Sequence, residues 1–485
     1  MGEAKYCANL VPNVETHECF SPTDAYSSCR EEKVRYFLAL QLLLVELVSA
    51  NELFKKEMIL EYFKESNPFV YSAIANENRY KNRDLYYQGE LDNKLFLKYD
   101  KKEYPVSEAE FFDIGVQKPL ENGIELTLAY RKAEGTQESN NIKTGDDGEA
   151  RVGVKLPLFS LAHGMNDRKL NIETARLQRV NLSNDSKNNL RILYFKTYSE
   201  YAKVLYYKAV IELQKELLNK AKKRESIVSD RVNVGSVAEV ALLEAQQQII
   251  NREQSLISSE NEFSYALENF LKYLNISREE FESQYRLFKL EEIEHAKVDY
   301  DEFLGMALEN RPDLKKYDIE LKKIKLEQKQ TNLLNYPKMD LSFYGVHDFE
   351  YESGFKVALD MDFPIERRKY DAKVLENKNS VLMMQTDKAK EILNIKTNLL
   401  NIVNSLNTIE MNLASSKKEI ELLETLEKAE NKKYVLGMSN LFMVNQREVY
   451  TLEVKKKALK YNFKYLLLEQ EAQREAGFSF KELRL

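Results

Sequence analysis

The sequence predicts a mainly helical protein with a small β part, in which a unit of two strands and one long helical hairpin occurs twice. Three observations predict this fold class. The composition is typical of long helices, two proline-free runs carry apolar residues at spacings of three and four, and a pattern centred on Gly235 returns at Gly437, 202 residues later. Spacings of three and four place apolar side chains on one face of a helix.

The composition favours helices over a loop-rich catalytic domain. The 485 residues include only 15 glycines, 9 prolines and no tryptophan, and 31% of them are charged. The 72 basic and 78 acidic side chains give a net charge of -6, which provides no bulk attraction to nucleic acid. No basic segment interleaved with aromatic residues is present. We therefore expect helices to dominate and expect no nucleic-acid partner.

An internal repeat organises the chain. The segment RVNVGSVAEVALLEAQ aligns with KYVLGMSNLFMVNQRE, so that Gly235 matches Gly437 and the flanking elements match as well. A repeat of this kind decides the architecture before any motif does. We therefore predict a first repeat at 51–274 and a second at 303–477. A linker at 275–302 joins them, and a tail at 478–485 follows.

Each glycine lies between two helices of unusual predicted length. Proline-free runs extend from about Met165 to Val234 and from about Tyr370 to Leu436, and a returning helix follows each glycine. At about 1.5 Å per residue, some 70 residues span on the order of 100 Å. Helices of globular domains typically have about 8 to 20 residues. Only a coiled coil or a helical bundle accommodates such lengths.

A pair of alternating segments precedes each long helix. We predict strands at about 123–131 and 150–158 in the first repeat and at about 338–346 and 354–363 in the second. In the last strand Phe355, Val357, Leu359, Met361 and Phe363 share one face, and charged residues share the other. A water-facing sheet over a core is one interpretation of such alternation. An apolar-out, polar-in barrel wall assembled from several chains fits strands between helices of this length better.

The N-terminal region carries the pattern of an export signal in an unusual place. The apolar run FLALQLLLVELV follows a basic segment and precedes Val-Ser-Ala, the order of a signal peptide and its cleavage site. The run is too short for a membrane-spanning helix, which needs about 20 residues. We predict that 1–33 is a mis-assigned extension, that 34–50 is a signal peptide and that the mature chain begins near Asn51. The alternative is an amphipathic helix of a cytosolic protein, which Glu46 favours.

Further motifs accompany the repeat. Pro157 and Pro364 close each second strand, the motif ALENRPDL opens the second half, and a weaker echo, YFKESNPF, opens the first. Together with the strand pairs, the Val-Gly turn and the following Leu-Leu-Glu-Ala-Gln, these features resemble the TolC-like outer-membrane efflux proteins. The resemblance extends from about Met58 to Gly477. Each motif alone is common, and the specificity comes from the ordered set that is present twice.

The resemblance implies a homotrimer in the outer membrane. Each chain of such a trimer gives four strands to a shared 12-stranded transmembrane β-barrel, and the helices continue it as a long periplasmic coiled-coil barrel. Sharing strands removes the open sheet edges that outer-membrane lipid does not tolerate. The implied function is a passive exit duct of a tripartite efflux or type I secretion system. Its implied partners are a periplasmic adaptor (membrane fusion) protein and an inner-membrane transporter.

The resemblance also predicts where the adaptor binds. Family members meet the adaptor at the tips of the helical hairpins. The candidate contact residues are therefore the two turn glycines and the residues that follow them: Gly235, Ser236, Val237, Gly437, Met438 and Ser439. Glycine supplies the left-handed backbone conformation of a tight helix end. An ordinary helix end explains both glycines too, and the two interpretations are compatible.

A periplasmic aperture is the second predicted region. Family members often carry acidic residues at the seventh and tenth positions, counting the turn glycine as one. Here these positions hold Ala241 and Glu244 in the first repeat and Met443 and Gln446 in the second. A ring of three Glu244 side chains attracts cations, although a solvated helix face explains a lone glutamate equally well. Tyr434 matches a tyrosine that latches neighbouring helices, and the first repeat lacks its counterpart.

The first repeat departs from the second between about 90 and 122. This stretch has no counterpart before Met339, and we expect a surface insertion near the barrel. The linker at 275–302 is expected to join the repeats at the waist of the tunnel.

No constellation for catalysis is present in the sequence. It lacks a phosphate-binding loop and the GxGxxG, GxSxG and HExxH motifs. The four histidines are scattered without metal-ligand spacing, and the three cysteines all lie within the first 33 residues. We expect no enzyme, cofactor or metal site. Two alternatives to the duct are a periplasmic adaptor, with glycine-rich β-segments around a single hairpin, and a coiled-coil scaffold, against which the amphipathic strands argue.

Overall fold

The computed structural model describes residues 52–105, 107–135, 144–290 and 295–478, so the predicted extension and signal peptide lie outside it. The chain divides into two compact units. In the smaller unit the described parts are β1 (Glu52–Leu53) and Glu279–Arg286. There β1 pairs in parallel with β6 (Tyr285–Arg286). The larger unit begins at Phe54 and contains the remaining elements.

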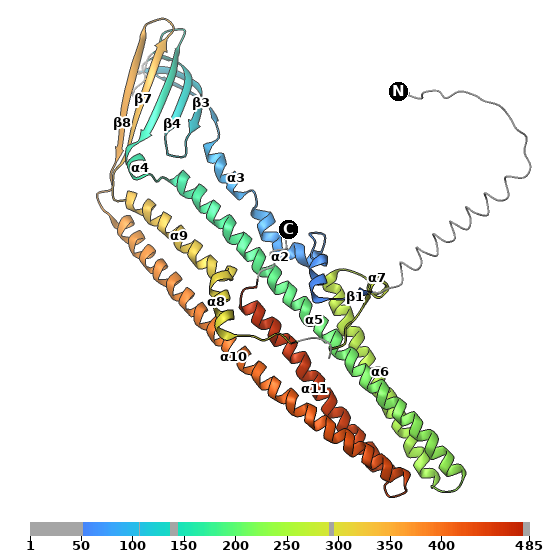
Figure 1. Cartoon of the computed structure of the whole chain (residues 1–485). Helices are drawn as coiled ribbons and strands as arrows, with labels where there is room; N and C mark the ends of the chain where they lie inside the picture. The colour runs from blue at the N-terminus through green and yellow to red at the C-terminus, as the bar shows by residue number, and fades with distance from the viewer. Residues whose placement is uncertain (1–51, 106, 136–143, 291–294, 479–485) are drawn as a thin grey trace, which may run out of the picture. The chain divides into compact units, whose positions relative to one another are not determined.

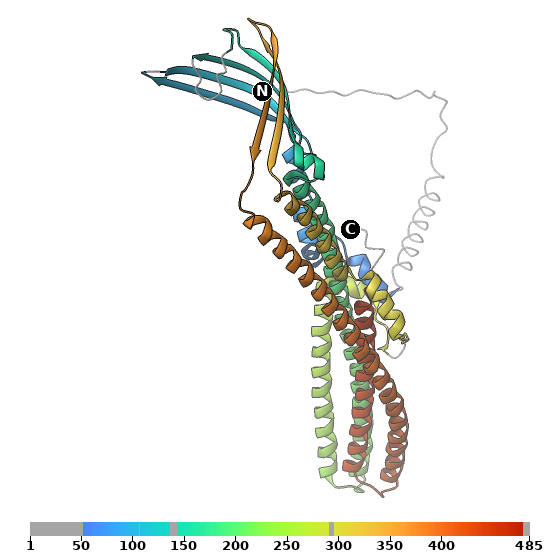
Figure 2. The same ribbon diagram turned by 90° about the vertical axis from the view of Figure 1, so that its left-hand side faces the viewer.

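Two helices of 67 and 68 residues dominate the larger unit, α5 (Asp167–Asn233) and α10 (Arg368–Val435) (Figure 1). The returning helices α6 (Glu239–Leu274) and α11 (Leu441–Glu475) pack along them. Both views show the two hairpin turns side by side at the same end of this unit (Figures 1 and 2). The prediction of a mainly helical chain with a small β part is confirmed.

Short helices flank the long ones in the larger unit. α2 and α9 begin at a proline, where the missing N–H group costs no helical hydrogen bond, and both pack on α5. These two starts are the motifs that open the halves, with Pro68 in the first and Pro312 in the second. The short helices of this unit are η1 (Lys56–Tyr62), α2 (Pro68–Tyr80), α3 (Arg83–Gln88), η2 (Gly89–Leu91), α4 (Leu158–His163), α8 (Tyr300–Asn310) and α9 (Pro312–Leu333), whereas α7 (Arg278–Gln284) belongs to the smaller unit from Glu279 onward.

The sheet of the larger unit has six antiparallel strands in the order β2-β3-β4-β5-β7-β8. The prediction of four strands per chain is therefore wrong in number. The stretch expected as a surface insertion instead forms β2 and β3, in which Leu95, Leu97 and Tyr99 stand at every second position and lie opposite Val116, Ile114 and Phe112. The strands are β2 (Lys94–Tyr104), β3 (Ser107–Pro119), β4 (Glu125–Gly135), β5 (Glu149–Pro157), β7 (Lys338–Asp348) and β8 (Ser353–Asp362).

The two faces of this sheet differ in chemistry. One face is apolar and exposed, and its side chains stand in register across the strands, from Leu95 on β2 through Leu128 and Val152 to Phe355 on β8. The opposite face is polar. There Asp113, which is 3% exposed, pairs with Arg131 at 2.9 Å and also with Arg151. The apolar side chains of the sheet are thus exposed, whereas the side chains of Asp113, Arg131 and Arg151 on the opposite face are about nine-tenths buried and are paired.

An aromatic cluster lies where α5 and α6 meet the start of the larger unit. The ring centroids of Phe54 and Phe270 are 5.5 Å apart, and Tyr201 donates a hydrogen bond to the Phe54 carbonyl oxygen at 2.7 Å. All three side chains are buried.

Within the described residues, no helix has both the length and the apolar composition that crossing a membrane requires.

Candidate functional site at the hairpin tips

The first tip is a helix end closed by glycine. Gly235 adopts a φ of 70°, a left-handed conformation that strains other residues. Its N–H donates to the Val232 carbonyl oxygen at 2.9 Å, and the Ser236 N–H donates to the Arg231 carbonyl oxygen at 2.9 Å. This pair of bonds satisfies carbonyl groups that the end of α5 leaves open. The chain then turns into α6.

The second tip repeats this geometry. Gly437 has a φ of 77°, its N–H donates to the Tyr434 carbonyl oxygen at 3.1 Å, and the Met438 N–H donates to the Lys433 carbonyl oxygen at 2.9 Å. No heavy atom lies within 4 Å of a Cβ built on either turn glycine. Backbone conformation, and not crowding, therefore selects glycine at both tips.

Both tips expose apolar side chains. Of the predicted contact residues, Ser236, Met438 and the two glycines are exposed, whereas Val237 and Ser439 are half-buried. Apolar residues next to them were not predicted from the sequence. These are exposed side chains that flank the turns: Val234, Val240, Leu436 and Phe442. The missed signal is an apolar residue directly before each turn glycine, where the last turn of a solvated helix ordinarily carries a polar one.

Tyr434 lies against the first hairpin of the same chain. The Arg231 guanidinium lies 5.4 Å from the centroid of the Tyr434 ring, within the range of a cation–π interaction. Its Nη2 also donates to the Val435 carbonyl oxygen at 3.1 Å, at the negative end of α10. The residue predicted as a latch thus joins the two tips within one chain.

The other two aperture residues lie on the returning helices. Glu244 is exposed on α6, and Gln446 is half-buried on α11, where its Nε2 donates to the Tyr450 hydroxyl at 3.2 Å. In the described ranges, no hydrogen bond or ion pair joins any two of Glu244, Tyr434 and Gln446. One chain alone does not bring these three residues together.

A buried ion cluster behind the tips escaped the sequence analysis. Glu448 on α11 is fully buried and accepts hydrogen bonds from Arg224 on α5 and from Arg252 on α6, the latter at 3.1 Å. Arg224 also donates to Asn445 at 2.9 Å. Burial lowers the pKa of Arg252, and Glu448 opposes that shift. One carboxylate therefore holds two guanidinium groups from the other hairpin.

A second charged link lies beside this cluster. Lys220 on α5 contacts Glu427 on α10 at 2.9 Å, and Glu427 is only 6% exposed. Burial opposes the charge on Lys220, but its hydrogen bonds to Glu427 and Glu216 raise its pKa overall. Charged pairs thus join the two hairpins at two levels above the tips.

The signal for Glu448 was its place in the apolar stripe of its helix. It stands four residues after Val444 and three before Thr451, both buried, so its side chain must face the other helices. The repeat offers no guide here, because the aligned position in the first hairpin holds Gln246.

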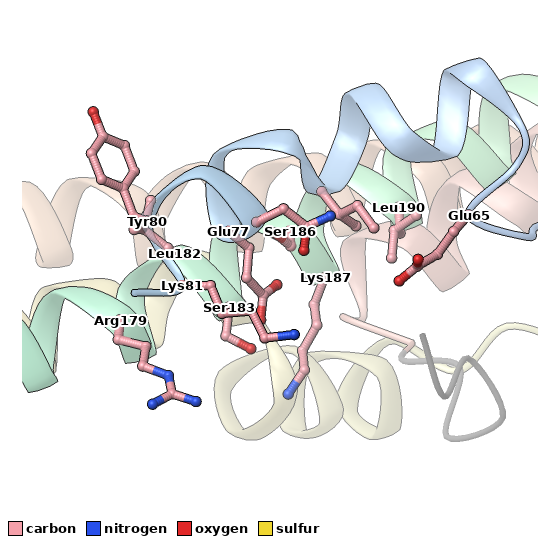
Figure 3. A pocket seen from close by; sticks show the side chains of 12 residues that line it. Glu65, Glu77, Tyr80, Lys81, Arg179, Leu182, Ser183, Ser186, Lys187 and Leu190 are labelled. Atoms are coloured by element: carbon pink, nitrogen blue, oxygen red, sulfur yellow. The ribbon is translucent and has the colours of Figure 1, made fainter. Parts of the chain in front are cut away.

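A pocket between α2 and α5 offers no catalytic arrangement. Glu77 of α2 and Ser183 and Lys187 of α5 face the same space (Figure 3). Its lining carries charges of both signs and contains no histidine or cysteine. Across the part of the chain that the structure describes, no group of three His, Cys, Asp or Glu side chains is placed to hold a metal ion.

Comparisons with known proteins give matches in structure alone. No family model and no curated protein matches the sequence. The open-state MtrE outer-membrane channel of Neisseria gonorrhoeae matches with a TM-score of 0.65 and 11% identity, over 87% of this chain and 88% of that one. The outer-membrane protein VceC of Vibrio cholerae matches with a TM-score of 0.63 and 10% identity, over 88% and 97%.

The protein CusC, whose structures concern transmembrane channel formation, matches with a TM-score of 0.64 and 11% identity over 87% of this chain and 92% of that one. Each match thus covers most of this chain. The chain has the fold of the TolC-like outer-membrane channels.

Proposed function

We propose that this chain is the passive outer-membrane exit duct of a tripartite efflux or type I secretion system and acts as a homotrimer. Solutes would pass from an inner-membrane transporter through the helical part and out through the barrel, without catalysis. The observation that carries the proposal is the exposed apolar face of the sheet, opposite a face lined with charges.

The sheet is built for a lipid surface. Leu95, Leu128, Val152 and Phe355 form one in-register row that crosses the sheet, each residue more than 60% exposed. A continuous apolar surface of this kind is rare in water and typical of the outer wall of a transmembrane barrel. The charged opposite face suits a water-filled passage.

Open edges of the sheet require further copies. In the described residues β2 and β8 are its two edges. Unpaired N–H and C=O groups cost several kcal/mol each in hydrocarbon, so an open sheet does not persist there. Six strands also fall short of the smallest known barrels, which have about eight. Edge pairing between copies closes the wall.

The helices α6 and α10 also carry exposed apolar stripes that would pack between chains of a ring. On α6 the exposed residues Leu243, Ile250 and Ile257 follow one another at steps of seven. On α10 a longer exposed stripe advances by 7 or 11 residues: Leu375, Leu382, Leu393, Leu400, Met411 and Leu422. Stripes at these periods are typical of helices packed on other helices. A contact between α6 of one copy and α10 of the next is heterologous, and such contacts form a ring when the rotation between copies closes.

The apolar tips supply the binding surface for an adaptor. Gly235, Ser236, Val237, Gly437, Met438 and Ser439 are the proposed contact residues. Glu244, Tyr434 and Gln446 are proposed to line the aperture. Apolar side chains beside the turns give such a contact its buried centre, because interface centres are depleted in charge.

The test compares two neighbouring positions on β4. Leu128 faces outward and Thr127 faces the polar side. Leu128→Arg places a charge in lipid, which costs about 2–4 kcal/mol near the bilayer centre. We expect less trimer in the outer-membrane fraction with Leu128→Arg, whereas Thr127→Arg keeps the trimer and alters its conductance in planar bilayers. A soluble monomer that makes no channels would refute the proposal and favour an adaptor or a scaffold.

A further inference from the structure

We infer that the β2–β3 hairpin is part of the membrane wall, so that the barrel has 18 strands, three copies of six, and closes by pairing β8 of one copy with β2 of the next. This inference rests on the proposed trimeric duct. It differs from the 12-strand barrel that the resemblance implies, in which β4 would form the edge between chains.

The β3–β4 ladder leaves β4 no free edge. Its register runs without a break from Ala109 opposite Gly135 to Pro119 opposite Glu125. The strands also approach closely, because a Cβ added at Gly115 would lie 2.5 Å from the Leu128 carbonyl oxygen. Only glycine fits this approach.

Side chains on the polar face fasten β3 in the same place. Asp113 of β3 pairs with Arg131 of β4 and with Arg151 of β5, and all three side chains are about nine-tenths buried. The Arg131 guanidinium also lies 4.6 Å from the centroid of the Phe111 ring. Separating β3 from β4 would break the ion pairs of Asp113 with Arg131 and Arg151. Removing the partner of a buried charge is strongly destabilising.

The outer face of the hairpin matches that of the other strands. Leu95, Leu97 and Tyr99 of β2 are 75%, 61% and 57% exposed, and each lies opposite an apolar residue of β3. Beyond them the outward positions become charged, at Lys101 and its partner Glu110. Along β4 the outward set has the same size and order, from Leu126 through Tyr130 to Lys132. An apolar band followed by charges fits a bilayer core followed by its headgroups.

The apolar band slants across the sheet as it does in a barrel. Leu97 is the middle of the band on β2, and the register carries it across five steps to Ser353 on β8. The band on β8, from Phe355 to Met361, is centred on position 358, five residues further along. One residue of stagger per strand, about 3.3 Å against a strand spacing of about 4.8 Å, gives a tilt of about 35°. Transmembrane barrels have tilts of about 35–45°.

The same stagger predicts how two copies meet. The strands alternate in direction, so β8 and the β2 of a neighbouring copy meet antiparallel, at opposite edges of each sheet (Figure 2). One further step of one residue places Leu97 of one copy opposite Leu359 of the other, both facing lipid. Barrel diameter grows roughly linearly with strand number, so the lumen is about 1.5-fold wider than that of a 12-stranded barrel.

Disulfide trapping in the full chain tests the inference. The background carries Cys7→Ser, Cys19→Ser and Cys29→Ser, so that only introduced cysteines react. Leu97→Cys is combined in turn with Val357→Cys, Leu359→Cys and Met361→Cys, which covers a register error of two residues either way. The matched control replaces Leu97→Cys by Leu128→Cys, the position that a 12-strand closure would place opposite Leu359.

We expect oxidation of trimers in membranes to link chains through Leu97→Cys and Leu359→Cys. The Leu128 variant should give roughly a tenth of that yield or less, because β4 lies three strand spacings from β8 of the neighbouring copy, and about 14.4 Å exceeds disulfide reach. Linking through Leu128 but not Leu97 overturns the inference while leaving the trimeric duct in place. Failure of all three Leu97 pairs in trimers that conduct ions also overturns it. Failure together with a soluble monomer removes the proposed function as well.

Discussion

The buried cluster behind the tips gives the sharpest test of how the two hairpins are held together. Replacing Glu448 by alanine leaves the guanidinium groups of Arg224 and Arg252, which are 9% and 6% exposed, without their shared carboxylate. Removing one partner of a buried ion pair costs about 3–5 kcal/mol. We expect the lower end, because Asn445 still accepts a hydrogen bond from Arg224.

The assay is amide hydrogen exchange of the detergent-solubilised protein, read on peptides from α11. Exchange reports the free energy of local opening. A cost of about 3 kcal/mol corresponds to exchange faster by about 100-fold or more, since each 1.4 kcal/mol is a factor of ten. The matched control is Glu424→Ala, which breaks the ion pair with Lys455 at 2.6 Å. The two side chains are 39% and 22% exposed, so we expect about 0–1 kcal/mol.

A rescue variant separates charge from packing. Changing Arg224, Arg252 and Glu448 together to methionine removes the uncompensated charges and fills the space with flexible apolar side chains. Replacing a whole buried ion cluster by apolar residues is often neutral or stabilising. We therefore expect exchange in the triple variant to return toward that of the parent. If Glu448→Ala exchanges no faster than Glu424→Ala, the cluster does not hold the hairpins together and the reasoning fails.

Three further predictions concern the tips and the interior of α11. Gly235→Ala should cost about 1–2 kcal/mol because of its left-handed backbone and lower the heat-dissociation temperature of the proposed trimer. Gly305→Ala, in a helix with free space around it, should not lower that temperature. Burial raises the pKa of Glu469. The folded state therefore favours its proton, and the stability present in acid is lost as pH rises through the folded pKa. Glu469→Gln should stabilise the protein at neutral pH by about 1.4 kcal/mol per unit of pKa shift, and chemical denaturation at pH 4 and pH 7.5 should show the gain shrinking in acid. Glu244→Ala should reduce cation preference in planar bilayers more than Gln446→Ala does; equal effects would mean that the two hairpins contribute alike.

Local sequence patterns were sufficient for the helices, because the period of the apolar residues and the positive-φ glycines are local properties. The helix that ends at Asn233 and the one that ends at Val435 stop within two residues of a glycine. Helix starts are local as well. Asn166 and Asn440 cap α5 and α11 by accepting hydrogen bonds from backbone N–H groups at 3.0 Å.

The strands β2 and β3 were harder to predict because the second repeat contains no segment that corresponds to them. Leu95, Leu97 and Tyr99 are spaced by two as in the later strands, but the apolar Phe96 between the first two interrupts the alternation with polar residues. The second repeat has no counterpart before Met339, and for this reason the sequence predicts a surface insertion at about 90–122. The information that the local sequence lacks is the pairing of β3. This pairing depends on the close approach of Gly115 to β4 and on the ion pair between Asp113 and Arg151 of β5, and neither contact can be read from a local pattern.

The contacts between the two hairpins are unequal, and this inequality predicts how the proposed duct would open. Arg224, Arg231 and Lys220 all lie on α5 and reach toward the second hairpin. Aligned positions of α10 hold Leu426, Lys433 and Leu422, so the second hairpin does not return these contacts. Within a chain the two hairpins are therefore held together by buried ion pairs.

Between chains the stripes on α6 and α10 offer apolar contact without such ion pairs among the described residues. Apolar helix faces slide over one another more readily than ion pairs exchange partners, because no buried charge loses its partner on the way. Opening should then occur between chains, with each pair of tips moving as one body.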